Sequence, residues 1–274
     1  MYLRVPQPYD FALSTARFRD LGTDGATVLH DGGLYRVVAG REVRIEPTAG
    51  GVRLEPGSAA IAAEVGHLLG LPFDLGAFRA WAVQHEVLAP IVRALPGLRP
   101  PLHPGPFEAL VVAVTTQQIS LLAAAAIRGR FVERFGTRHE VAWGFPTRER
   151  VAASDPEEYP SLGFSRRKAE YVVGLARSDL DLRALDALPD EEVVETLTAL
   201  PGIGRWTADW FLARHLARAE AWPAGDLGLR KAVSTFCAAG RPLTIDEVRA
   251  LGERFAPFRN LSAHYLLAAA RMNA

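Results

Sequence analysis

Short segments in which apolar and charged residues alternate occupy the first 57 residues, a pattern typical of half-buried antiparallel strands. The three clearest segments are 34–38, 42–46 and 52–55. Glycine-containing turns separate them. Ser58 then has the position of an N-cap for a helix that extends to about residue 69. The pattern predicts a small antiparallel sheet followed by a helix.

From Asp74 onward the periodicity is almost entirely helical, with interruptions rich in proline and glycine. The clearest interruption, residues 96–106, holds five prolines and separates the first long helix from an apolar, helix-like run that contains Gln117 and Gln118. A chain of 274 residues that is 49% hydrophobic can bury a substantial core and predicts two or three subdomains. We therefore expect a mostly α fold, with a small α+β domain over 1–72 and a helical core over 73–274.

A glycine-rich turn joins two of the predicted helices. The first, 191–200, is amphipathic with acidic residues in its first turn, and the second runs from Arg205 to His215. Gly202 and Gly204 can take positive φ and let another chain approach the backbone closely. The unpaired N–H groups of the second helix point back at the turn, which can therefore bind a phosphate oxygen. An αα-hairpin whose glycines only permit tight packing fits this local pattern equally well.

Three segments, in this order along the chain, resemble the helix-hairpin-helix (HhH-GPD) DNA glycosylases of the 3-methyladenine DNA glycosylase II branch. They are Thr115–Ser120 (TTQQIS), Leu162–Ala169 (LGFSRRKA) and Leu200–Ala208 (LPGIGRWTA). The loop Ala221–Gly225 and Asp226 follow the third segment. The resemblance is clear over about 105–270. It implies two helical subdomains flanking a cleft, a helix-hairpin-helix at about 191–215 and a catalytic loop at 221–228.

By this resemblance Asp226 is the catalytic carboxylate. Breaking an N-glycosidic bond develops positive charge on the sugar, which a carboxylate can stabilise while it orients a water molecule. Asp226 fits equally well as the N-cap of the helix that follows, and the two roles can coexist. Bifunctional relatives use a lysine in the second hairpin helix, where this chain has Trp206. The two lysines of the chain, Lys168 and Lys231, do not match that position, so we expect no lyase activity.

The target base must leave the duplex before the reaction, and Gln118 stands where relatives place the side chain that fills the gap. An alkylated purine is cationic, so aromatic faces can attract it by roughly 0.5–2 kcal/mol. The candidate aromatic walls are Trp206, Trp210, Trp222, Phe11 and Phe18, with Tyr9 beside them. Trp206 matches a pocket position of the family, whereas each of the others fits a core role as well. Leu266–Ala269 stand where some relatives have aromatic residues, which predicts a more open pocket.

The net charge is zero, because Lys+Arg and Asp+Glu both number 31. DNA binding then requires local clusters of basic residues, and we expect a basic cleft in a neutral molecule. Any single cluster can also be an ordinary solvated helix face. The residues expected at the DNA are Gln117, Gln118, Ile119, Ser120, Arg166, Lys168, Gly202, Ile203, Gly204, Arg205, Thr207 and Arg230.

Cofactors and compartment follow from composition. A single cysteine, Cys237, excludes an internal disulfide and a four-cysteine iron–sulfur cluster, and no dense His/Cys cluster predicts a metal. The resemblance implies at most a monovalent cation at the hairpin when DNA is bound. We find no membrane-spanning segment and no secretory signal pattern, and expect a cytoplasmic monomer that associates with the nucleoid through DNA.

The sequence thus predicts a monofunctional glycosylase that releases alkylated bases, such as 3-methyladenine, from double-stranded DNA and leaves an abasic site for base excision repair. One alternative is a non-enzymatic hairpin protein that only holds DNA, for which an unpaired acid near phosphates would weaken binding. The other is a glycosylase for oxidised or deaminated bases, which predicts more hydrogen-bonding groups and less aromatic surface in the pocket. The order among 3-methyladenine, 7-methylguanine, ethenoadenine and hypoxanthine stays open.

Overall fold

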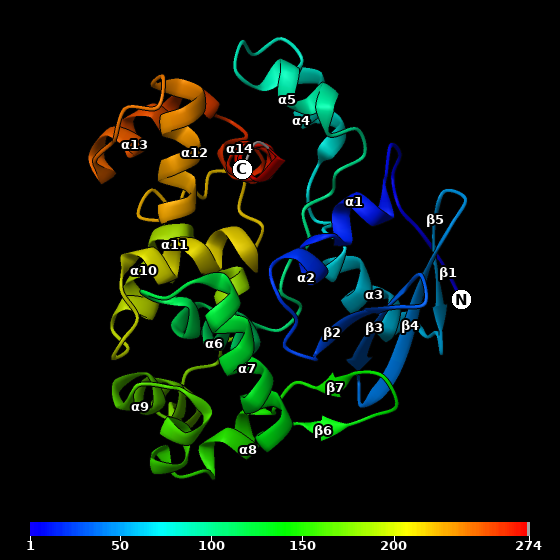
Figure 1. Ribbon diagram of the computed structural model, residues 1–274, viewed down its shortest axis with the longest axis vertical. Helices are drawn as coiled ribbons and strands as arrows, with labels where there is room; N and C mark the ends of the chain where they lie inside the picture. The colour runs from blue at the N-terminus through cyan, green and yellow to red at the C-terminus, as the bar shows by residue number, and fades with distance from the viewer. Residues whose placement is uncertain (273–274) are drawn as a thin grey trace.

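A five-stranded antiparallel sheet forms the N-terminal part of the computed structural model, which describes residues 1–272 (Figure 1). The strand order is β1-β5-β4-β3-β2. The strands are β1 (Tyr2–Arg4), β2 (Thr27–His30), β3 (Gly33–Val38), β4 (Arg41–Thr48) and β5 (Gly51–Glu55). Ile45 pairs with both Leu34 and Leu54, and all three are buried under α3 (Ala59–Leu68). The Ser58 hydroxyl accepts from Ile61 N, which confirms the predicted N-cap.

The three predicted strands are confirmed, whereas β1 and β2 were not expected. Their lengths, three and four residues, are too short to display alternation. Two short helices, α1 (Phe11–Thr15) and α2 (Arg17–Asp20), lie between them in the chain. Of these two helices, α2 lies on the side of the N-terminal part that faces the helical core (Figure 1).

The rest of the chain is mostly helical, as expected, and is held by three apolar clusters. One cluster joins the helices α4 (Leu75–Ala82), α5 (Leu88–Ala94), α12 (Leu227–Cys237), α13 (Ile245–Gly252) and α14 (Arg259–Met272). The other two join α6 (Pro106–Thr116), α7 (Leu121–Phe135), α8 (Arg148–Ala152), α9 (Arg166–Arg177), α10 (Asp190–Thr198) and α11 (Arg205–Arg214). Short 3-10 helices cover Pro156–Leu162, Ala184–Ala187 and Glu253–Phe255. The two groups of helices occupy different ends of the molecule (Figure 1), and residues from both line a shared cavity.

Two local features were not expected. The helical part contains a strand pair, β6 (Thr137–Arg138) and β7 (Trp143–Gly144), that docks on the sheet: Glu42 Oε2 accepts from Val141 N at 2.9 Å and Ala142 N at 2.6 Å. The segment with Gln117 and Gln118 is a turn rather than part of a helix, because α6 ends at Thr116. Gln118 has φ +58°, and Ser120 caps α7 by accepting from Ala123 N.

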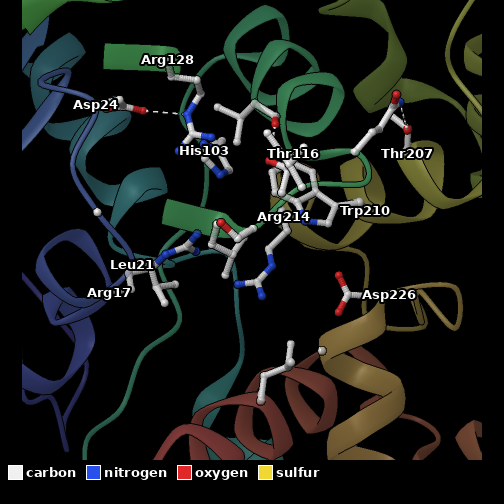
Figure 2. Close-up of a pocket in the computed structure, with 18 of the residues that line it drawn as sticks. Arg17, Leu21, Asp24, His103, Thr116, Arg128, Thr207, Trp210, Arg214 and Asp226 are labelled. Carbon is white, nitrogen blue, oxygen red and sulfur yellow. Dashed lines mark hydrogen bonds and ion pairs between the residues drawn. The ribbon is translucent and has the colours of Figure 1, made fainter. Parts of the chain in front are cut away.

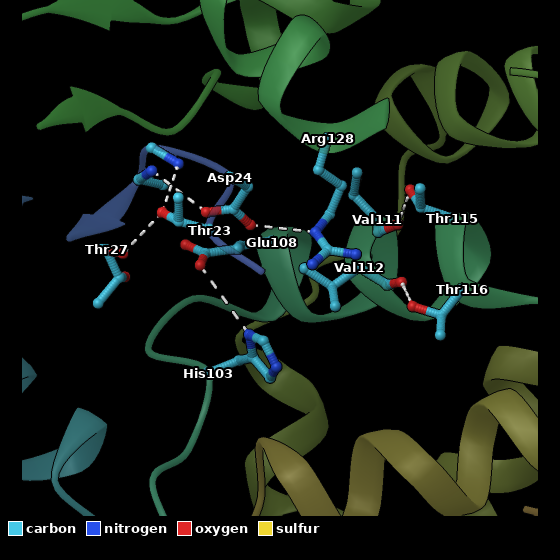
Figure 3. Close-up of polar contacts among 12 residues, drawn as sticks. Thr23, Asp24, Thr27, His103, Glu108, Val111, Val112, Thr115, Thr116 and Arg128 are labelled. Carbon is cyan, nitrogen blue, oxygen red and sulfur yellow. Dashed lines mark hydrogen bonds and ion pairs between the residues drawn. The ribbon is translucent and has the colours of Figure 1, made fainter. Parts of the chain in front are cut away.

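Buried ion pairs join the N-terminal sheet to the helical core. The guanidinium of Arg36 on β3, 4% exposed, contacts Glu108 on α6 and donates to Thr27 Oγ1 at 2.7 Å. Burial alone would raise the pKa of Glu108, but Arg36 and His103 outweigh it and hold this pKa at about 2. Nearby, Arg128 on α7 pairs with Asp24 at 3.0 Å (Figure 3). The position of the sheet against α6 and α7 is thereby set by charge pairing.

Three histidines meet where α3 packs near α11. The rings of His67 and His215 lie 5.3 Å apart, and His215 Nδ1 bonds to the His103 carbonyl at 2.7 Å. Burial lowers the pKa of His67, and lowers those of His103 and His215 to about 4 each. The rings are therefore neutral at pH 7, and acid must protonate buried groups here.

We predict that acid destabilises the protein from about pH 6.5 downward. The folded-state pKa values of His103 and His215 lie below their ordinary value of 6.5. The unfolded chain therefore binds more protons between pH 6.5 and 4, and the free energy of unfolding falls as the pH falls. Each such histidine contributes up to about 1.4 kcal/mol per pH unit. Urea denaturation between pH 7.5 and 4.5 measures this slope.

His215→Gln should remove the contribution of one histidine to the pH dependence of the free energy of unfolding. His30→Gln serves as the control, because the His30 side chain is exposed. A free energy of unfolding that stays constant between pH 6.5 and 5 would contradict the burial argument.

Candidate functional site

A cavity of about 980 Å³ lies between the two groups of helices and the N-terminal domain. Its lining includes Arg17–Phe18 and Leu21–Asp24 from the N-terminal part, Leu102–Pro104, Thr116–Leu121, and Asp226–Gly228. Side chains from these separate parts of the chain converge on one space (Figure 2). A volume of this size suits a ligand as large as a nucleotide.

Asp226 stands at the edge of this cavity and begins α12. Its Oδ1 accepts from Leu229 N at 2.8 Å, so the carboxylate is the N-cap of the helix. The loop before it is closed by a hydrogen bond from Asp226 N to Pro223 O at 2.8 Å. The side chain is half-buried and faces the cavity (Figure 2). Capping therefore holds one carboxylate oxygen, and within residues 1–272 no cation pairs with this carboxylate.

The two glycines of the hairpin between α10 and α11 have different roles. Gly202 has φ +81°, and a Cβ there would lie 2.1 Å from the Tyr171 ring, so only glycine fits. Gly204 has φ −96° and is the N-cap of α11. Gly204 therefore does not use the positive φ that a glycine can take. An added Cβ at Gly204 would meet nothing within 4 Å, which leaves the backbone open to another molecule.

Internal hydrogen bonds engage several residues that we expected at the DNA. Gln117 Nε2 donates to Gly202 O at 3.0 Å and to Thr207 Oγ1 at 3.2 Å. Lys168 Nζ donates to the carbonyls of Thr115 and Gln117 at 2.8 and 2.6 Å. These bonds attach the 117–120 turn to the hairpin and to α9. Gln117, Lys168 and Thr207 therefore shape the surface, and Gln118 with the 37%-exposed Ile119 projects from it.

A second groove of about 520 Å³ runs between the hairpin and α9. Gln118, Ser165, Lys168 and Gly202–Gly204 line it together with Arg167. Arg166, the residue we had expected, does not line it: its side chain is 78% exposed and lies 3.8 Å from Glu157. Ile203 is buried under the turn.

Two other arginines expected at the DNA are also occupied. Arg205 Nε donates to Asp209 at 2.8 Å, although 58% of the side chain remains exposed beside the hairpin. Arg230 Nη2 donates to Leu243 O at 2.7 Å, and Arg230 lines neither cavity nor groove. Its helix position turns Arg230 toward the loop before α13, and its contact with DNA stays a prediction.

Three of the five expected aromatic walls line the cavity, namely Phe18, Trp206 and Trp210. Trp222 does not, because it is 8% exposed in the core, stacks on Phe255 at 5.4 Å and donates to Val248 O at 2.9 Å. Phe11 packs against the N-terminal core, edge-on to Tyr9 at 6.5 Å. Both assignments to the pocket were wrong, because these side chains pack in apolar clusters and not against the cavity.

The cavity is basic although the molecule is neutral, as expected. Six cationic side chains and three carboxylates line it. The cations are Arg17, Arg36, Arg128, Arg214, Lys231 and Arg271; the carboxylates are Asp24, Glu108 and Asp226. None of these six cations was among the residues expected at the DNA, because they come from distant parts of the chain and are brought together only by the fold. No group of three or more potential metal ligands occurs within residues 1–272.

A family model and a bacterial protein are similar to this chain. A family model described as the HhH-GPD superfamily base excision DNA repair protein matches residues 111–257. The DNA-3-methyladenine glycosylase of Bacillus subtilis is 31% identical over 70% of this chain and 66% of its own length, just under two thirds.

Two solved structures are also similar. The 3-methyladenine DNA glycosylase of Archaeoglobus fulgidus has a TM-score of 0.91 and 28% identity, and the match covers 100% of this chain and 99% of that one. The Schizosaccharomyces pombe 3-methyladenine DNA glycosylase in complex with abasic DNA has a TM-score of 0.62 and 29% identity, over 71% of this chain and 97% of that one. No helix within residues 1–272 is long and apolar enough to cross a membrane.

We predict opposite effects of the same substitution at two glycines. Gly202→Ala should lower the free energy of unfolding by roughly 2–4 kcal/mol, since alanine is strained at φ +81° and its Cβ would overlap the Tyr171 ring. Gly174→Ala, in the exposed middle of α9 with nothing within 4 Å, should raise it by about 0.5–1 kcal/mol. Urea denaturation of the two variants measures both values. Equal effects would show that the hairpin turn does not require glycine.

Proposed function

Because the chain belongs to the HhH-GPD superfamily of base excision DNA repair proteins, we propose that it is a monofunctional DNA glycosylase. It hydrolyses the N-glycosidic bond of alkylated bases, 3-methyladenine-type purines above all, in double-stranded DNA and leaves an abasic site. One observation carries this proposal: a capped carboxylate with no cationic partner within residues 1–272, at the edge of a cavity large enough for an extruded nucleotide.

Asp226 acts on the sugar in this mechanism. As the bond from C1′ to the base nitrogen breaks, its electron pair leaves with the base and positive charge develops on the sugar. The carboxylate stabilises that charge and orients the water whose oxygen then bonds to C1′. The water proton passes to the carboxylate or to the departing base. Since Leu229 N–H holds one oxygen, the carboxylate is preorganised before the base arrives.

The hairpin supplies no amine for a covalent intermediate. Trp206 occupies the cavity wall, and a Cβ on Gly225 would lie 3.4 Å from its ring, so the indole packs beneath the loop that carries Asp226. In our proposal water, rather than a lysine, attacks the sugar, and the strand is not cleaved. No cofactor takes part, and a monovalent cation at the hairpin carbonyls stays a prediction.

Helix N-termini explain how a neutral protein can hold DNA. Four helices begin beside the cavity or the groove, with Ser120, Ser165, Gly204 and Asp226 at their N-caps. Their unpaired N–H groups and dipoles favour phosphate oxygens without reading sequence. The exposed turn with Gln118 at φ +58° then fills the gap in the duplex, and strain of this kind is typical of functional turns. We place the enzyme in the cytoplasm, as a monomer on chromosomal DNA.

We predict that Asp226→Asn lowers the single-turnover rate of base release by about 10²–10⁴-fold. Asparagine caps a helix as well as aspartate does, so α12 and DNA binding should be retained. Release is measured from duplexes that contain 7-methylguanine or ethenoadenine, and binding from the same duplexes by fluorescence anisotropy.

Asp74→Asn is the matched control, because Asp74 caps α4 through Ala77 N at 2.9 Å and does not line the cavity. It should release bases at the wild-type rate. Binding of the duplexes without release of any base by the wild-type protein would instead support a hairpin protein that only holds DNA.

A further inference from the structure

The turn at 117–120 projects from the protein surface and has a backbone conformation that needs support. Gln118 has φ +58°, a region that residues other than glycine rarely adopt. Such a conformation persists only where surrounding contacts hold it. The outer side of the turn offers little support, because Gln118 is exposed and Ile119, Leu121 and Leu122 are 37%, 48% and 63% exposed. The contacts that hold the turn therefore come from beneath it.

Lys168 on α9 supplies the first of these contacts. Its Nζ donates to Thr115 O at 2.8 Å and to Gln117 O at 2.6 Å. Thr115 lies in the last turn of α6 and Gln117 is the C-cap, where carbonyls lack intrahelical partners and the helix dipole favours a cation. The ammonium group has three N–H donors, and two of them are already used within the protein. Lys168 is thus better placed to hold the turn than to bind a phosphate.

The Gln117 side chain supplies the second contact, which reaches the hairpin. Its Nε2 donates to Gly202 O at 3.0 Å and to Thr207 Oγ1 at 3.2 Å, so both N–H donors of the amide are used. Gly202 in turn rests against Tyr171, whose ring lies 2.1 Å from the position that a Cβ would take. Lys168 and Tyr171 are three residues apart and share one face of α9. The turn, the hairpin and α9 therefore form one closed set of contacts.

This set of contacts fixes the turn relative to the groove of about 520 Å³, which Gln118 lines together with the hairpin residues 202–204. The open backbone at Gly204 and the exposed Arg167 are available to a phosphate in this groove. A side chain that fills the gap left by an extruded base must be placed accurately, since a misplacement of about 1 Å can cost about 100-fold in rate. Lys168 and Gln117 thus link the hairpin that would bind the DNA backbone to the residue that would enter the duplex.

We infer that Lys168 and Gln117 are positioning residues for base extrusion: they hold Gln118 in the conformation in which it replaces the target base in the duplex. The inference rests on the proposed glycosylase function, but it concerns a step before the bond to the base breaks. Binding of the backbone and bond cleavage at Asp226 do not depend on these two side chains. Their removal therefore slows extrusion and leaves the other two steps intact.

The test compares single-turnover release of 7-methylguanine, at saturating protein, from two duplexes. In one the base lies opposite cytosine. In the other it lies in a one-nucleotide bulge, where it has no partner and its departure leaves no gap, so extrusion costs least. Lys168→Met keeps the apolar stem but loses the donors, and should lower the rate for the paired base at least about tenfold more than for the bulged base. The ratio of the two rates within one variant cancels any loss of folded protein.

Arg167→Met is the matched control, because Arg167 precedes Lys168 in the chain and lines the same groove but is exposed. It should weaken binding of both duplexes and leave the ratio of the two rates at the wild-type value. Gln117→Met should change that ratio in the same direction as Lys168→Met. Lys168→Arg, whose guanidinium can also donate to two carbonyls, should recover part of the rate for the paired base.

A second measurement observes extrusion without bond cleavage. The fluorescence of 2-aminopurine placed beside the paired 7-methylguanine rises when that neighbour leaves the stack, and Asp226→Asn should keep the base attached to its sugar. In this background, and at saturating protein, Lys168→Met should reduce the amplitude of the rise. Arg167→Met should leave the amplitude unchanged.

Two results would overturn the inference. One is an equal loss of rate for the paired and the bulged base in Lys168→Met, which would give Lys168 a role in stability or bond cleavage only. The other is a loss of affinity in Lys168→Met with a salt slope reduced by about one, which would make Lys168 a phosphate contact. Failure of the proposed function looks different, because the wild-type protein then releases the base from neither duplex while the fluorescence rise still reports extrusion.

Discussion

The buried ion pair between Arg36 and Glu108 is the interaction on which the rest of the structure depends. It joins the N-terminal sheet to α6, so Arg17, Phe18 and the 21–24 segment become a wall of the cavity rather than part of a separate domain. Breaking a buried pair by removing one partner typically costs about 3–5 kcal/mol, because the other charge stays buried alone. The same Glu108 carboxylate lies 3.9 Å from His103 Nδ1 and lines the cavity, so one carboxylate contributes both to the contact between the domains and to the cavity surface.

Helix N-termini supply most of the other backbone groups that face the site. Four helices begin at the site, with N-caps at Ser120, Ser165, Gly204 and Asp226. The first turn of each helix has N–H groups that lack intrahelical partners. The chain can therefore be electrically neutral and still present positive potential where a DNA backbone would lie. Asp226 combines both functions, since the hydrogen bond that begins α12 also orients its carboxylate.

Sequence reasoning succeeded where the signal was local. Ser58, the strand alternation and the turn at Gly202 each depend on neighbours in the chain, and the structure agrees. The positions of Trp222 and Phe11 could not be predicted, because side-chain direction there depends on tertiary packing and both lie in apolar cores. The arginines of the cavity come from residues 17 to 271 and form no pattern in the chain. The turn at Gln118 was not predicted, because it lies within an apolar run. Ser120 is an N-cap residue and could have indicated the start of a new helix there.

The role that we propose for the Asp226 carboxylate is to stabilise positive charge on the sugar. Its most direct test is the affinity for duplexes that contain a cationic pyrrolidine in place of the abasic sugar, relative to the neutral tetrahydrofuran analogue. If Asp226 has this role, the wild-type protein binds the cationic analogue about 100-fold more tightly or better, and Asp226→Asn loses this difference while its affinity for the neutral analogue is unchanged. Equal affinity of the wild-type protein for both analogues would show that Asp226 stabilises no positive charge on the sugar.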